Sequence, residues 1–360
     1  MREDWDIRLF KDVFDLQMGK TPDRKNFSLF EGDNTWVSIK DLDGKYISSS
    51  KECISDEAAK NIKLVKRGTV IMSFKLTVGK TAIAGKDLYT NEAIMAFNLR
   101  NGYDIDASFL YYYLKNYRWE GSNKAVMGIT LNKATISKHK IAIPPKLTQL
   151  SIVSELDKLN ELIQIKKEQL KDYDALAQSI FYEMFGDPVE NEKGWEVKKF
   201  GDLFKLKSGD GLSSKDFNTG IYPVYGGNGI SGYHNSFNMK GCYIIIGRVG
   251  VYCGNVRKVD GEFWLTDNAF RLIYKENEQN PFFILYLLNI LDLHQYANAA
   301  AQPVISNLTL KSINVPLPSL SLQQSFAHKI EQIERQKAEV QKTITDLETL
   351  LAARMQYWFD

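Results

Sequence analysis

The sequence predicts a mixed α+β protein built by tandem duplication, with each copy consisting of a globular lobe followed by a long helix. Two observations carry this prediction: a set of segments recurs about half a chain apart, and each copy ends in a heptad pattern of apolar residues. The 360 residues allow about two domains of ordinary size. Hydrophobic residues make up 44% and charged residues 25%, which is typical of a globular chain rather than a disordered one.

The repeat is clearest where each copy opens. Residues 5–19, WDIRLFKDVFDLQMG, recur 190 residues later as residues 195–209, WEVKKFGDLFKLKSG. The offset then shrinks. Residues 90–94 match 266–270 at an offset of 176, residues 109–114 and 141–144 match 283–288 and 315–318 at 174, and Gln149 matches Gln323. A drifting offset followed by a constant one indicates that insertions fall in the loops of the lobes only.

Each lobe contains short runs of Ile, Val, Phe and Tyr broken by Gly, Asn and Lys, as expected for strands and turns. Residues 243–246 predict a buried strand, and residues 69–72 predict its counterpart. Residues 109–114 and 281–288 predict a short helix in each lobe, and Pro281 is placed to open the second.

The end of each copy predicts a long helix. Apolar positions alternate steps of four and three over more than four heptads, which is typical of a coiled coil about 50 Å long. Phe185-Gly186-Asp187-Pro188 predicts the end of the first helix. Two seams of equal length favour pairing of the helices with each other; packing of each helix on its own lobe is the alternative. The seam positions are Ile152, Leu156, Leu159, Ile163, Lys166, Leu170, Tyr173, Ala177, Ile180 and Met184, then Phe326, Ile330, Ile333, Lys337, Val340, Ile344, Leu347, Leu351, Arg354 and Trp358.

Composition argues against several classes of protein. The longest apolar run, residues 282–288, is far shorter than the roughly 20 residues of a membrane span. The first residues lack an apolar signal core, so we expect a cytoplasmic protein. Three cysteines without a CxxC pair and four scattered histidines argue against a disulfide framework and a structural metal site.

The net charge is only +2, but its distribution is uneven. Residues 217–259 contain no Asp or Glu and carry four basic residues, five tyrosines and nine glycines. Residues 121–154 and 293–330 also lack acids. Basic patches with interleaved Tyr and Gly suit a phosphate backbone. The alternative is a β-rich core whose charges lie elsewhere.

A search for catalytic motifs leaves one weak pattern. Gly19-Lys20-Thr21 and Gly79-Lys80-Thr81 lack the further Gly of a phosphate-binding loop, and no methyltransferase motif is present. Asp23, Asp43 and Lys45 fit a loose metal-nuclease arrangement, in which two carboxylates hold Mg²⁺ and the Lys steadies water. Both Asp residues also suit turns.

The duplicated order of lobe and heptad helix resembles the specificity subunit of type I restriction-modification systems. The resemblance covers the whole chain. It is carried by the Trp5 and Trp195 openings, by residues 144–149 (PPKLTQ) and 318–323 (PSLSLQ) at the helix entries, and by residues 181–186 (FYEMFG) at the helix exit.

The resemblance implies a fold, partners and boundaries. Each lobe would be a target-recognition domain reading one half of a split site in double-stranded DNA, with no catalytic residue in this chain. The helices would form an antiparallel coiled coil that spaces the lobes and docks two modification (methyltransferase) subunits, which bind S-adenosylmethionine and methylate adenine. Restriction subunits, which are ATP-driven, can join. The chain itself would hold no cofactor and no metal. The implied boundaries are 1–147 and 187–320 for the recognition domains, and 148–186 and 321–360 for the helices.

The expected DNA-contacting residues lie in loops and at strand ends. Lys75 and Arg248 follow equivalent strands, so we expect equivalent roles; Arg can bind guanine with two hydrogen bonds, whereas Lys more often holds phosphate. A metal nuclease and a coiled-coil scaffold without DNA contact remain as alternatives. The candidates are Lys20, Thr21, Arg24, Lys25, Lys75, Asn123 and Lys124 in the first lobe, and Ser213, Ser214, Lys215, Tyr225, Asn228, Tyr233, His234, Arg248 and Gln302 in the second.

Overall fold

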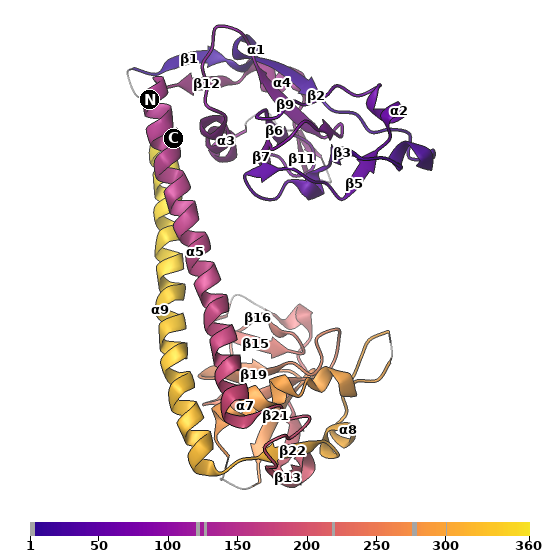
Figure 1. The fold of residues 1–360 in the computed structure, drawn as a ribbon, viewed down its shortest axis with the longest axis vertical. Coiled ribbons are helices and arrows are strands. Elements are labelled where there is room, and N and C mark those ends of the chain that lie inside the picture. Colours follow the sequence, from indigo (N-terminus) through magenta and orange to yellow (C-terminus); the bar gives the residue numbers. More distant parts are fainter. Residues whose placement is uncertain (1–3, 120–122, 126–127, 218–219, 276–278, 300) are drawn as a thin grey trace. The chain divides into compact units, whose positions relative to one another are not determined.

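The computed structural model describes residues 4–119, 123–125, 128–217, 220–275, 279–299 and 301–360, with the backbone alone for 123–125 and 128–130. The chain forms two compact units: residues 1–165 with 343–360, and residues 166–342. We call their globular parts lobe 1 and lobe 2. Two 40-residue helices, α5 (Lys146–Phe185) and α9 (Leu320–Phe359), contribute to both units (Figure 1). Within the described ranges, no helix has the length and apolarity needed to cross a bilayer.

Lobe 1 is built on a five-stranded sheet of order β2-β9-β6-β7-β4 and a three-stranded sheet of order β5-β3-β8. β1 and β12 form a separate antiparallel pair, and β12 directly precedes the start of α5. The main core packs one face of the larger sheet against α3. The elements are β1 (Asp6–Leu9), α1 (Phe10–Val13), β2 (Phe14–Met18), η1 (Phe27–Phe30), β3 (Asn34–Val37), η2 (Ile39–Asp41), β4 (Tyr46–Ile47), β5 (Glu52–Ile54), α2 (Asp56–Ala59), β6 (Val70–Ser73), β7 (Thr81–Ala84), β8 (Tyr89–Thr90), β9 (Ile94–Leu99), α3 (Ala107–Asn116), β10 (Asn123–Ala125), β11 (Gly128–Thr130), α4 (Lys133–Lys138) and β12 (Lys140–Ile143).

Lobe 2 repeats this plan with sheets of order β14-β21-β18-β19 and β16-β15-β20-β17. The predicted strands at 69–72 and 243–246 are confirmed as β6 and β18, and the predicted short helices as α3 and α7. The elements are β13 (Glu196–Lys199), α6 (Phe200–Leu203), β14 (Phe204–Ser208), η3 (Ser214–Asp216), β15 (Tyr222–Gly226), β16 (Gly229–His234), β17 (Met239–Lys240), β18 (Tyr243–Gly247), β19 (Val256–Val259), β20 (Glu262–Leu265), β21 (Ala269–Tyr274), α7 (Pro281–Ile290), η4 (Leu293–Tyr296), α8 (Asn307–Lys311) and β22 (Asn314–Leu317).

Strand pairing corrects one part of the repeat alignment. The N–H of Gly19 donates to the carbonyl of Ile94 at 3.3 Å, and the N–H of Gly209 donates to the carbonyl of Ala269 at 3.2 Å. Ile94 and Ala269 are therefore counterparts, 175 residues apart. The expected offset of 176 is wrong by one residue, because it matches Thr90-Asn91 with the similar pair Thr266-Asp267, whereas the structure places Thr90 opposite Leu265 in the repeat. In a strand, such a slip exchanges the two faces.

A buried glutamine joins each lobe to the helix that follows it. The side chain of Gln149 accepts a hydrogen bond from the Asp106 N–H (2.8 Å) and donates to the carbonyls of Asp104 (3.1 Å) and Pro144 (3.0 Å). Gln323 repeats the arrangement in lobe 2 with the Asn280 N–H (2.9 Å) and the Pro318 carbonyl (2.9 Å). Asp106 and Asn280 are the N-cap residues of α3 and α7. The two lobes therefore fasten their short helix to their long helix by the same contact.

α5 and α9 pack side by side in opposite directions, which confirms the predicted antiparallel coiled coil (Figure 1). In the first unit, Glu155 near the start of α5 forms an ion pair with Arg354 and accepts a hydrogen bond from the Trp358 indole N–H at 2.9 Å. In the second unit, Asp174 of α5 forms an ion pair with Lys337 at 2.7 Å. All twenty seam positions are buried or half-buried.

The helix ends also belong to the cores of the lobes. Phe181 and Phe185 of α5 pack with Phe326 of α9 around Phe283 of α7. The corresponding part of the first unit packs Ile152 and Leu156 into the core of lobe 1. The long helices therefore both pair with each other and pack on the lobes, although the sequence analysis treated these two arrangements as alternatives. The ring of Trp195 closes the end of α5, because its indole N–H donates to the carbonyl of Phe185 at 2.8 Å.

We expect Gln149→Leu to destabilise the protein, because an apolar side chain would leave one buried N–H and two carbonyls without partners. The loss should be about 1–3 kcal/mol or more in chemical denaturation. Gln323→Leu should behave alike. Gln324→Leu, at an exposed neighbouring position, is the matched control. Equal stability of all three variants would show that the buried amides do not hold the helices.

Candidate nucleic-acid interface

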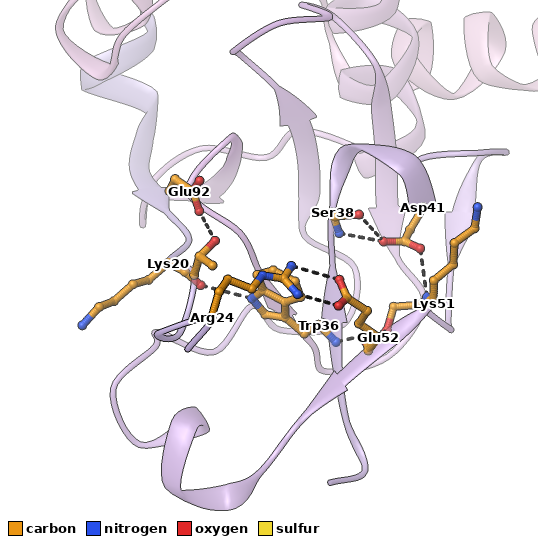
Figure 2. A network of polar contacts seen from close by, with 10 residues as sticks. Lys20, Arg24, Trp36, Ser38, Asp41, Lys51, Glu52 and Glu92 are labelled. Atoms are coloured by element: carbon orange, nitrogen blue, oxygen red, sulfur yellow. Dashed lines mark hydrogen bonds and ion pairs between the residues drawn. The ribbon is translucent and has the colours of Figure 1, made fainter. Parts of the chain in front are cut away.

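In lobe 1, four of the expected residues lie in or beside the loop that joins β2 to β3. The loop is anchored by backbone hydrogen bonds, since the N–H of Lys20 donates to Thr90 at 2.9 Å. The indole N–H of buried Trp36 donates to the carbonyl of Lys20 at 3.1 Å. Figure 2 shows the Lys20 side chain pointing away from this network. The loop thus has a fixed base, with Lys20 and Lys25 exposed on it.

Arg24 is held in place by one carboxylate and two aromatic rings; Figure 2 shows the carboxylate of Glu52 and the ring of Trp36. Its guanidinium group forms two hydrogen bonds with Glu52, at 2.5 and 3.0 Å. It also lies 4.4 Å from the ring centre of Phe30 and 5.0 Å from that of Trp36. The hydrogen bond from Arg24 lowers the pKa of Glu52, and the same bond raises the pKa of Arg24. Arg24 is therefore ordered, with its charge balanced.

Glu92 is a second carboxylate that the sequence analysis missed. The hydroxyl group of Thr21 donates a hydrogen bond to the carboxylate of Glu92. Burial acts to raise the pKa of Glu92, but the Thr21 hydrogen bond and the charges of Lys75 and Arg24 prevail and lower it. Three expected residues thus act on one acid, Thr21 through a hydrogen bond and Arg24 and Lys75 through their charges. Glu92 lies in a repeated segment, and this was the one signal that could have identified it.

Lys75 and Arg248 are not equivalent, contrary to the sequence expectation. The N–H of Leu131 donates to Phe74, and the N–H of Ile305 donates to Arg248, both at 2.9 Å. The counterpart of Arg248 is therefore the buried Phe74, and Lys75 lies one residue further along. The error arose because the two residues were matched by charge rather than by strand register. The same strand end carries a core ring in lobe 1 and a cation in lobe 2.

Arg248 is half-buried at the end of β18. Its guanidinium carbon lies 5.3 Å from the ring centre of Phe270, and one terminal nitrogen reaches the Asp267 carbonyl at 3.5 Å. Its Nε atom is buried without a hydrogen-bond partner among the described residues. An unpaired donor in this position is costly unless a ligand or water satisfies it. Arg248 is thus positioned by an aromatic face with hydrogen-bonding capacity left over.

Two other expected residues lie near Arg248. Asn228 is exposed in the tight turn between β15 and β16. The turn lies against the chain beyond β18, where a Cβ on Gly227 would stand 2.3 Å from the carbonyl of Val249; only glycine fits there. Gln302 is exposed beside Pro303, whose carbonyl accepts the Gly250 N–H at 2.9 Å.

Five of the remaining expected residues of lobe 2 form a separate group along β16. Phe217, directly after η3, packs on Gly232, which brings the exposed Ser213, Ser214 and Lys215 toward that strand. Tyr233 is 48% exposed, and the His234 ring lies 5.2 Å from the Trp264 ring. Tyr225 lies elsewhere, half-buried against Phe263 at 5.4 Å. The side chains of Asn123 and Lys124 lie outside the described residues.

The possible nuclease residues have other contacts. The Asp23 carboxylate accepts the N–H of Lys25 at 3.0 Å, as in a turn. Lys45 forms an ion pair with Asp157 of α5 at 2.6 Å and 2.7 Å to its two oxygens. Within the described ranges, no three His, Cys, Asp or Glu side chains are grouped so that they could hold a metal ion. Asp43 is exposed in the loop before β4.

Comparison with known proteins identifies the family. A family model described as the type I restriction modification DNA specificity domain matches residues 2–172 and 192–349. The chain therefore belongs to the specificity subunits of type I restriction-modification systems, a non-catalytic class with two recognition domains.

Curated relatives and solved structures agree with this assignment. The chain is 27% identical to the EcoprrI specificity subunit of Escherichia coli, over 86% of this chain and 83% of that protein. It is 28% identical to the MjaIX specificity subunit of Methanocaldococcus jannaschii, over 59% and 55%. The fold is similar to the S subunit from M. genitalium, with a TM-score of 0.57, 18% identity and coverage of 99% and 96%. A chain from a study of assembly and conformational transition of the type I system has a TM-score of 0.64, with 17% identity and coverage of 100% and 98%.

We expect Glu52→Gln to lower the thermal stability of the protein near neutral pH, because it breaks the charged pair with Arg24. A carboxylate whose folded pKa is lowered stabilises the fold above its unfolded pKa, and this contribution is lost as the pH falls through the folded pKa. The difference in melting temperature between wild type and Glu52→Gln should therefore shrink on acidification. Glu57→Gln, at an exposed position of α2, is the control. A pH-independent difference would mean that the ion pair has no part in it.

Proposed function

We propose that this chain is the DNA sequence-recognition subunit of a type I restriction-modification complex, in which each lobe reads one half of a bipartite site. The observation that carries the proposal is that the two lobes share the same framework contacts but differ in the residues at their strand ends and loops. Gln149 and Gln323 make the same contacts in both lobes, whereas Phe74 and Arg248 occupy one position with opposite chemistry. Such a plan suits two half-sites of different sequence.

The helix pair would set the spacing between the half-sites. A helix of 40 residues is about 60 Å long, between one and two turns of duplex DNA. Two major grooves on one face of the DNA would then be within reach, and all four base pairs are distinguishable in that groove. The division into domains at 1–147, 148–186, 187–320 and 321–360 belongs to this proposal.

The partners follow from the same assignment. Two modification subunits would dock on α5 and α9, bind S-adenosylmethionine and methylate adenine; restriction subunits driven by ATP would join them. The complex would act in the cytoplasm. The sixteen expected DNA contacts remain part of the proposal, with Arg248, Asn228 and Gln302 the best supported because they gather at one strand end. Arg24 would contribute chiefly to the shape of its loop.

We expect Arg248→Ala to weaken binding to cognate DNA and to relax preference within one half-site, at a cost of about 1–3 kcal/mol. Arg248→Lys should retain non-specific binding but lose part of the preference, because an ammonium group cannot form the two parallel hydrogen bonds of a guanidinium group. Competition binding against single-base variants of the site measures both effects. Equal losses on cognate and scrambled DNA would exclude Arg248 from base readout.

Lys25→Ala should instead weaken binding to all sequences alike and reduce its dependence on salt, since an exposed lysine in the loop is placed for phosphate contact. The measurement is the slope of log affinity against log salt concentration for wild type and variant. Absence of any DNA affinity at low salt, with or without partners, would favour a scaffold protein.

We also expect no methyl transfer and no cleavage by the isolated chain, since no methyltransferase motif is present in the sequence and Lys45 of the loose nuclease pattern is paired with Asp157. Adding the cognate modification subunits and S-adenosylmethionine should produce methylation at a bipartite site. Sequencing the methylated adenines tests this outcome, and methyl transfer by the chain alone would contradict the proposal.

A further inference from the structure

The two lobes differ at one edge of their main sheets. In lobe 1 the sheet ends β6-β7-β4, whereas in lobe 2 it ends β18-β19. β7 and β19 are counterparts, because Ile83 pairs with Val70 and Lys258 pairs with Ile244 at the same place in the repeat. Within the described part of lobe 2, nothing corresponds to β4, and β19 has a strand on one side only.

In lobe 1, β4 covers this edge at Ile83 and Ala84. It runs parallel to β7, and the N–H groups of Ile83 and Gly85 donate to the carbonyls of Lys45 (2.8 Å) and Ile47 (2.7 Å). Ile47 is buried in the core on one side of the sheet. Lys45 forms its ion pair with Asp157 of α5 and lies 5.2 Å from the ring centre of Tyr112.

The difference originates in one connection. β3 leads to β5 through residues 38–51, which contain η2 and β4. Asp41 joins the two ends of this segment, because its carboxylate accepts hydrogen bonds from the Ser38 N–H (2.8 Å) and the Lys51 N–H (2.9 Å) (Figure 2). The corresponding strands of lobe 2, β15 and β16, are joined by a tight turn at Gly226–Gly229. Among its described residues, lobe 2 therefore lacks a counterpart of β4, and α7 contacts β19 through a hydrogen bond from the Asn289 amide to the Val256 carbonyl at 3.3 Å.

A cavity of about 810 Å³ lies at the uncovered edge. Five successive residues of the edge, 256–260, line it together with Tyr225, the counterpart of the residue at which lobe 1 turns away toward β4. α7 forms one wall, and the helix pair α5 and α9 forms another. The space corresponds to the place that β4 and Lys45 occupy in lobe 1.

The walls of the cavity carry both signs of charge. The ammonium of Lys258 lies 4.7 Å from the ring centre of Phe282. Lys337 is shared between two carboxylates, Asp174 at 2.7 Å and Glu334 at 3.0 Å. Tyr286, the counterpart of Tyr112, is also in the wall. Two acids sharing one lysine leave oxygen atoms able to accept further hydrogen bonds.

We propose that this cavity takes an extended segment of the modification subunit, which adds to β19 as a parallel fifth strand. The inference rests on the proposed function, because the helix pair that would dock the modification subunit is also a wall of the cavity. Strand addition supplies affinity through main-chain hydrogen bonds and specificity through alternate side chains. In lobe 1 the same edge binds the short parallel strand β4, so a parallel strand fits an edge of this geometry.

The position of β4 defines the chemistry of the segment. The residue in the place of Ile47 would be apolar and would face Tyr225 and Val259. The residue in the place of Lys45 would be Lys or Arg and would meet the carboxylates of Asp174 and Glu334. The lining carries three acids, Asp174, Asp260 and Glu334, against three bases, Arg257, Lys258 and Lys337. It therefore has no excess of positive charge to attract a DNA phosphate.

Lys258→Pro is the test variant. The N–H of its counterpart Ile83 faces β4 rather than β6, so proline at 258 removes a donor from the free edge and keeps the pairing with β18. Proline is tolerated on such an edge. Lys258→Val keeps the donor and removes the charge, which makes it the matched control. We expect Lys258→Pro to weaken assembly of the full chain with cognate modification subunits roughly tenfold, and Lys258→Val by less than about twofold.

Hydrogen exchange on the wild-type chain gives an independent measurement that needs no variant. The N–H groups of Lys258 and Asp260, the counterparts of the Ile83 and Gly85 donors that bind β4, should exchange quickly in the chain alone and slowly in the complex with modification subunits. Failure of the wild-type chain to form or activate any complex would overturn the proposed function. A complex that methylates DNA while these two N–H groups stay unprotected, with both variants alike, would overturn this inference alone. Protection of the same two groups by cognate DNA without the modification subunits would also overturn it.

Discussion

The buried amide at the start of each long helix is the contact on which the rest of the architecture depends. Gln149 and Gln323 each satisfy the backbone of a short helix and the turn before a long one, in places that water does not reach. An amide can donate and accept at once, so one side chain joins two helix starts that would otherwise leave backbone groups unpaired. The direction in which each long helix leaves its lobe is set locally by this contact. Both lobes use this contact at the start of the long helix that follows them.

Around this frame, the lobes vary in the connections rather than in the strands. The shared sheet order up to β7 and β19 survives an insertion that lobe 1 has and lobe 2 lacks. Loops tolerate such changes because their backbone lies at the surface. Two of the residues that differ between the lobes, Arg24 and Arg248, lie against aromatic rings. Rigid support of a polar group lowers the entropy cost of binding a ligand.

The sequence predicted the duplication, the long helices and their seam because these features depend on periodic apolar residues. Local pattern also predicted α3, α7, β6 and β18. It did not identify the carboxylates Glu52 and Glu92. Glu92 lies in a repeated segment, but the contacts that make both acids important form between loops that meet only after folding. It matched Lys75 with Arg248 because charge was visible and strand register was not. The uncovered edge of β19 was also beyond reach, because two strands separated by one short turn give no sign of a missing neighbour.

The composition of the first unit has a consequence for the order of events during synthesis. Its core includes Leu351, Met355, Trp358 and Phe359 beside residues of lobe 1, whereas the second unit is one continuous stretch, 166–342. Domains tend to fold as they leave the ribosome, beginning with the N-terminal one. Here the N-terminal unit cannot be complete until residues 343–360 have been made, so the second unit can finish first. Until then, the apolar face of the first half of α5 would lack its partner, and a nascent chain would depend most on chaperones or early partners during that interval.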